Sequence, residues 1–183
     1  YYNPLITPNR TLENGYTVGR DAGRLIVATE SAVLEGKLIG EVYQGPAQTQ
    51  VPKIDLDGYY QSQKASARGV QLIIGQYQPR YDATTGILRS NLAAAANQVL
   101  LTDTVTAIAD GLDLSSALPA NRQGTVILDT SRLNGFNLGA LTIAAKDSIT
   151  VDSKTQVANG GSITLYGPQV NVNANLVAHG GSI

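Results

Sequence analysis

The chain has 183 residues, 15% of them charged, with a formal net charge of −1 and a pI near 5.8. Lysine and arginine are scattered rather than clustered, so the sequence predicts no nucleic-acid partner. The absence of cysteine excludes disulfides and thiol chemistry. No apolar run approaches the length of about 18 residues that a membrane span needs, so no membrane insertion is expected.

A strand template first appears between residues 23 and 40. It reads Gly-x-apolar-x-apolar, a turn of four residues, and then alternating apolar or small positions. Such alternation indicates a strand with one apolar face, because successive side chains point to opposite faces. The template recurs without a gap 138 residues later, where Gly161, Ile163, Leu165, Val170, Val172, Ala174, Leu176 and Ala178 stand for Gly23, Leu25, Val27, Ala32, Leu34, Gly36, Leu38 and Gly40.

A first excursion from this pattern covers residues 44–68. It holds two acidic residues, Asp55 and Asp57, directly before two tyrosines, Tyr59 and Tyr60. Acidic and aromatic side chains in a loop on a rigid scaffold can bind a sugar, so these four residues are candidate binding residues. The alternative is that the two acids form a turn and the tyrosines cover a flank of the fold. Calcium is not favoured, because Asp-x-Asp-Gly here lacks the later Glu of an EF-hand loop.

The template resumes at Leu72 and Ile74, and a second excursion covers residues 76–97. It contains Tyr77 and Tyr81, which we add to the candidate binding residues. Strand positions follow at Val99 and Leu101.

A short helix is predicted over residues 102–112. Thr102 or Asp103 would cap it, and one face would carry Val105, Ile108, Ala109 and Leu112 at a spacing near 3.6. After Gly124 the strands are expected to return, at Val126, Leu128 and Leu133.

The C-terminal third repeats itself. Gly-Gly-Ser-Ile occurs at 160–163 and again, 20 residues later, at 180–183. One copy back, Leu141 and Ile143 match Ile163 and Leu165 at an offset of 22, Ile149 and Val151 match Val170 and Val172 at 21, and Val157 matches Val177 at 20. We place the two one-residue slips in the polar links, between Ile143 and Ile149 and between Val151 and Val157.

These repeats predict a parallel β-helix. Three short strands in about 20 residues leave no room for crossover helices, which need about a dozen residues. Each coil would therefore pair with the next coil, about 4.8 Å away. Residues 1–183 would form one segment of such a stack, all-β apart from the excursions and the short helix.

The residues also resemble a known family. The stretch 16–27, the segment Val33-Leu-Glu-Gly-Lys-Leu38, the link Arg132-Leu-Asn-Gly135 and the closing Gly-Gly-Ser-Ile repeats are similar to filamentous haemagglutinin-like exoproteins of bacterial two-partner secretion. The family's secretion motif, of Asn-Pro-Asn type, is reproduced neither at Asn3-Pro4-Leu5 nor at Pro8-Asn9-Arg10. Together with the lack of an initiator Met, this predicts an interior fragment of a longer rod.

The resemblance implies a right-handed β-helix that is secreted to the bacterial cell surface. It implies export through an outer-membrane two-partner transporter, and attachment to a host receptor, a glycan or an exopolysaccharide. It also allows a stalk that presents a contact-dependent toxin. Ile183 would expose an unpaired coil, so end-to-end self-association is expected.

An enzyme that acts on polysaccharide is the alternative, since such enzymes also use β-helices. It would need convergent acids about 5 to 9 Å apart. The regular coils offer Asp129, Asp147 and Asp152, which we interpret as solvated corners, and His179, the single histidine, as a turn residue. We therefore expect a structural and adhesive segment with no catalytic residues, no metal and no cofactor.

Overall fold

The computed structural model describes residues 17–50, 65–108, 113 and 115–183. The chain divides into two compact units, one made of residues 1–20 and 43–67 and the other of residues 21–42 and 68–183.

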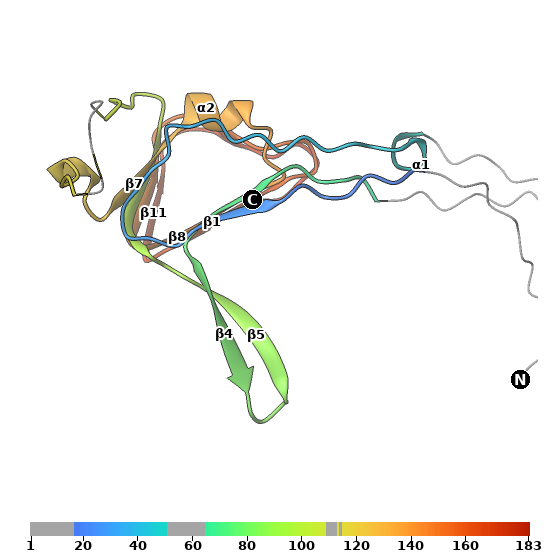
Figure 1. Cartoon of the computed structure of the whole chain (residues 1–183), viewed down its shortest axis with the longest axis horizontal. Helices are drawn as coiled ribbons and strands as arrows, with labels where there is room; N and C mark the ends of the chain where they lie inside the picture. The colour runs from blue at the N-terminus through green and yellow to red at the C-terminus, as the bar shows by residue number, and fades with distance from the viewer. Residues whose placement is uncertain (1–16, 51–64, 109–112, 114) are drawn as a thin grey trace, which may run out of the picture. The chain divides into compact units, whose positions relative to one another are not determined.

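The described part of the chain is mostly β-strand, with few and short helices (Figure 1). The first unit contains α1 (Pro46–Thr49). The second unit contains β1 (Arg24–Val27), β2 (Ala32–Val33), β3 (Gln71–Ile74), β4 (Gln76–Asp82), β5 (Ile87–Ala93), β6 (Ala96–Thr102), the 3-10 helix η1 (Ala120–Arg122), β7 (Thr125–Asp129), α2 (Thr130–Gly135), β8 (Ala140–Val151), β9 (Thr155–Gln156), β10 (Ser162–Tyr166), β11 (Gln169–Val172) and β12 (Leu176–Val177).

In the first unit, the buried side chain of Gln48 holds three chain segments together. Its Oε1 accepts the Gly19 and Gly45 backbone N–H groups at 2.8 and 2.9 Å. Its Nε2 donates to the carbonyls of Gly19 and Ala65 at 3.0 and 2.8 Å. One amide thus supplies the backbone partners that a strand would otherwise provide.

In the second unit, parallel strands stack in two series that share β8. One series runs β1, β3, β8, β10, and its register aligns Leu25, Leu72, Leu141 and Ile163. The other runs β2, β7, β6, β8, β11 and aligns Ala32, Val126, Val99, Ile149 and Val170. All these pairings are parallel, and together they make a nearly closed sheet.

The second series does not follow chain order. β7 comes after β6 in the chain but lies between β2 and β6 in the sheet. The first series has no strand at the corresponding place, since β1 pairs directly with β3. The second unit is therefore not a simple succession of equal coils.

The predicted registers at the C-terminal end are largely confirmed. Ile163 pairs with Leu141 at an offset of 22, and Val170 pairs with Ile149 at 21. The Val157–Val177 match was wrong by one residue: Val177 pairs with Gln156, still at 21. The offset of 20 appears at the Ser162–Ser182 bridge, so the second slip falls in the turn after β9 rather than between Val151 and Val157.

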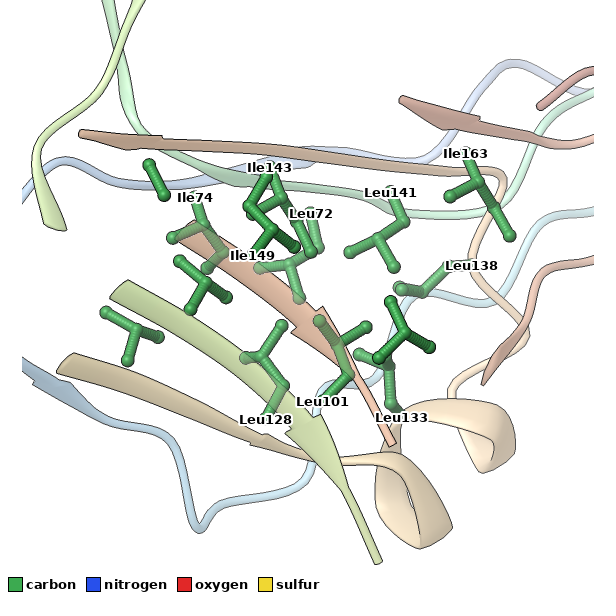
Figure 2. Close-up of a cluster of buried hydrophobic side chains, with 14 of the residues drawn as sticks. Leu72, Ile74, Leu101, Leu128, Leu133, Leu138, Leu141, Ile143, Ile149 and Ile163 are labelled. Atoms are coloured by element: carbon green, nitrogen blue, oxygen red, sulfur yellow. The ribbon is translucent and has the colours of Figure 1, made fainter. Parts of the chain in front are cut away.

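The core lies between the two strand series. Figure 2 shows its aliphatic side chains pointing toward one another from β3, β6, β7, β8 and β10, with Leu133 joining from α2. Leu141, Ile143, Ile149 and Leu101 are fully buried. Burial alternates in β7 and at both ends of β8, as the one apolar face of the template predicted, whereas β3 buries three consecutive residues.

Glycines allow close approach at one corner of this stack. A Cβ added at Gly139 would lie 2.5 Å from the Gly69 carbonyl oxygen, and one added at Gly181 would lie 1.8 Å from that of Gly161. Both distances are shorter than any real contact, so the backbones can meet there only without side chains.

One strand prediction and one helix prediction need correction. Leu133 lies in α2 rather than in a strand, because the Asp129 carboxylate accepts the Ser131 and Arg132 N–H groups and caps a helix at this point. In the described part of the expected 102–112 helix, Thr102 ends β6 and residues 103–108 are not helical; residues 109–112 lie outside the description.

Side chains explain why residues 103–108 are not helical. The Ile108 N–H, which a helix would pair with the Thr104 carbonyl, instead bonds Glu35 Oε1 at 2.9 Å. The Arg122 guanidinium donates to the Thr106 carbonyl at 2.8 Å. Backbone groups that a helix would pair internally are thus bound elsewhere.

Candidate binding surface on the β4–β5 hairpin

The predicted binding residues fall into two groups. Asp55, Asp57, Tyr59 and Tyr60 lie outside the described residues. Tyr77 and Tyr81 both lie on β4, in the second excursion. This excursion is an antiparallel β4–β5 hairpin that leaves the parallel sheet as a two-stranded ribbon (Figure 1).

The hairpin turns at residues 83–86. Gly86 has φ of 68°, and its N–H bonds the Asp82 carbonyl at 2.8 Å. The Asp82 carboxylate accepts the Thr84 N–H at 3.0 Å. Hydrogen bonds from the Thr85 side chain, and then from the Thr84 backbone, lower the pKa of Asp82 below its ordinary value. The ionised carboxylate therefore organises the turn.

One face of the hairpin is aromatic and aliphatic. In the register, Tyr77 lies opposite Leu92 and Tyr81 opposite Leu88, with Pro79 and Ser90 between them. Tyr81 is 65% exposed and Leu88 69% exposed. Large apolar side chains in a row, open to solvent and held on a defined backbone, are typical of a recognition surface.

The opposite face is polar and basic. Arg80 lies directly across from Arg89, and Gln78 lies across from Asn91. Like charges placed opposite each other weaken a strand pair. Within the described residues neither arginine has an acidic partner at ion-pair distance.

A third cation lies at the base of the ribbon. The Arg24 guanidinium carbon of β1 is 6.0 Å from the centroid of the Tyr77 ring, a distance at the limit of a cation–π contact. This contact connects the aromatic face of the hairpin to the first strand of the stack.

The acids considered for an enzyme have other partners. Asp129 caps α2 and pairs with Arg132 at 3.1 Å. Asp152 accepts a 2.8 Å hydrogen bond from Asn173, and Asp147 is exposed. His179 is exposed, and its carbonyl accepts the Gly160 N–H in a turn. The described residues contain no cluster of three or more acidic or histidine side chains suited to a metal ion.

Leu88, Leu92, Arg80 and Arg89 were missed as surface residues in the sequence. A signal was present: Asp82 and Gly86 bracket a short turn after residues 76–82, in which polar residues alternate with tyrosine or proline, and this favours a hairpin. The hairpin register then brings the leucines onto the tyrosine face.

Comparison of the chain with protein-family models, with curated proteins and with solved structures found no match. None of the helices that the structure describes is long and apolar enough to cross a membrane.

Proposed function

We propose that the chain is a structural and adhesive segment of a secreted bacterial surface exoprotein, folded as a right-handed parallel β-helix. The observation that carries this proposal is the alignment of Leu25, Leu72, Leu141 and Ile163 in one parallel series. Stacks of this kind gain length by adding coils, and each coil contacts only its neighbours. Such a rod suits projection from a cell surface, and export would use an outer-membrane two-partner transporter.

The hairpin is the adhesive element in this proposal. Its tyrosine face suits the apolar faces of sugar rings. Arg80 and Arg89 lie on the opposite face of the ribbon, where they suit a second, acidic or hydroxylated segment of the same polymer. A host glycan or a bacterial exopolysaccharide would therefore bind along the ribbon. Asp129 caps a helix and Asp152 accepts a hydrogen bond from Asn173, while Asp147 is exposed and lies in no cluster of acids among the described residues, which favours attachment over hydrolysis.

The test measures binding of the purified chain to a panel of host glycans and bacterial exopolysaccharides, with reducing-end release followed in parallel. The variant carries Tyr77→Ala and Tyr81→Ala. The matched control is Tyr166→Ala, a tyrosine 63% exposed on β10. Saturable binding that the double variant loses and the control keeps, without release of reducing ends, supports adhesion. Release would support the enzyme instead, and an absence of binding would leave this segment as a spacer.

A further inference from the structure

An apolar cavity of about 190 Å³ lies beside the first layer of the stack. Its floor comes from Leu72 on β3 and Leu128 on β7, both buried, and from Leu133 on α2. Figure 2 shows Leu133 at α2. The remaining apolar walls come from Leu25, Val33, Leu34, Leu38 and Phe136.

Leu25 borders this pocket because β1 is an end strand of the sheet order, so among the described residues no further strand covers it. Leu25 shares a register column with Leu72, Leu141 and Ile163, which are 3%, 0% and 2% exposed, yet Leu25 itself is 37% exposed. A side chain that the pattern assigns to the core thus borders empty space.

The rim is charged and has one uncommitted cation. Arg132 pairs with Asp129 at 3.1 Å and also donates to the Glu35 carbonyl. Lys37 lines the same cavity, is exposed, and has no ion pair among the described residues. With two cations and one carboxylate, the lining has a net charge of +1.

We propose that this cavity binds a small amphipathic carboxylate, with a benzene-sized or short aliphatic group inside and the carboxylate beside Lys37. The volume suffices for the apolar half, because an apolar cavity of about 150 Å³ holds benzene. The charge of the rim supports the anionic half. The site is separate from the β4–β5 hairpin, and its occupancy does not depend on the adhesive role.

The test uses phenylacetate and its neutral counterpart 2-phenylethanol, titrated into the full chain and followed by the backbone amide shifts of Leu72, Leu128 and Leu133. Phenylacetate is expected to bind saturably. Lys37→Gln is expected to weaken phenylacetate by about two- to fivefold, the range of one exposed ion pair, and to leave 2-phenylethanol unchanged. Lys154→Gln, at an exposed lysine outside the cavity lining, is the matched control.

A filling variant tests the location. Gly36 lines the cavity, and a Cβ added there meets nothing within 4 Å, so Gly36→Leu should fold and abolish binding of both probes. Leu38→Phe fills the same space from another residue. It replaces Gly36→Leu in the test if Gly36→Leu shifts amide signals throughout the chain. The proposal is overturned if phenylacetate gives no saturable shifts, if the filled variants bind it as well as the parent, or if Lys37→Gln weakens both probes equally.

Discussion

The side-chain oxygen of Asn134 accepts a 2.7 Å hydrogen bond from the backbone N–H of Gln156. Its Nδ2 donates to the neighbouring Lys154 carbonyl at 2.9 Å. Asn134 lies in α2, and Gln156 belongs to β9, whose strand partner is β12. The Asn134 side-chain amide therefore gives β9 a hydrogen-bond donor and an acceptor, as a neighbouring strand would. As a result, α2 can occupy a position where the parallel pattern would place a strand.

Mutating Asn134 tests whether its side-chain amide takes the place of a neighbouring strand. Asn134→Ala leaves the Gln156 N–H and the Lys154 carbonyl without their partners, and should lower the free energy of unfolding by about 1–2 kcal/mol. Asn134→Asp keeps the acceptor but loses the donor, so its free energy of unfolding should lie between those of the parent chain and of Asn134→Ala. Urea unfolding measures both, with Asn159→Ala in an exposed turn as control. Equal stability of Asn134→Ala and the control would contradict the role of the amide.

The glycine corner predicts opposite results for one substitution at two places. Gly139→Ala would put a Cβ 2.5 Å from the Gly69 carbonyl oxygen, so the backbone must move and stability should fall by more than about 2 kcal/mol. Gly23→Ala meets no described atom within 4 Å, and should be neutral or stabilise by about 0.4–1 kcal/mol through the unfolded state. Thermal unfolding of both variants measures these two changes in stability. Similar losses in both would mean that close backbone approach is not the cause.

The sequence predicted the registers of β8 with β10 and with β11, because the alternation of these strands permits little else, but it misplaced Val177 by one residue. Shifting Ile163 against Leu141 by one residue would turn every apolar side chain outward. The place of β7 could not be predicted in this way. Its pairing with β6 depends on a return of the chain after residue 102, and residues 103–124 show no alternation that records it.

For the candidate site, the sequence located Tyr77 and Tyr81 but not the surface that they form. Which residues face them depends on the hairpin register, and that register depends on the turn at Asp82 and Gly86. Leu133 was assigned to a strand because apolar spacing alone does not separate a short helix from a strand. The capping carboxylate of Asp129 was the deciding signal.

Arg122 should contribute strongly to stability. Its side chain is 4% exposed, it donates to the Thr106 carbonyl, and its Nη2 lies 4.0 Å from Glu35 Oε1. Arg122→Ala removes the donor and leaves Glu35 beside an empty space, so a loss of about 2 kcal/mol is expected. Glu35→Gln should cost less, because the amide oxygen can still accept the Ile108 N–H. Chemical denaturation of the two variants measures this order, and the reverse order would contradict it.

The hairpin turn should depend on pH at the acid end. The folded pKa of Asp82 is lowered by hydrogen bonds from Thr85 and Thr84, so its stabilising effect is present above the unfolded value of about 3.9 and is lost as pH falls through the folded value. The amide shifts of Thr84 and Gly86 should therefore titrate with a midpoint below about 3.9. Asp82→Asn should abolish this titration. A midpoint at or above the unfolded value would contradict the lowered pKa.

The edge at β11 should promote association. β11 pairs with β8 and, in the part of the chain that the structure describes, with no other strand. Val170 and Val172, which the pattern assigns to the apolar face, are 39% and 50% exposed. An open edge with apolar side chains is a template for another strand.

Light scattering at micromolar concentration should show concentration-dependent association, and Val172→Lys should reduce it, because an edge lysine opposes pairing. Leu88→Lys, on the hairpin, controls for a general gain in charge. A strict monomer, or equal effects of both lysines, would show that the β11 edge does not drive association.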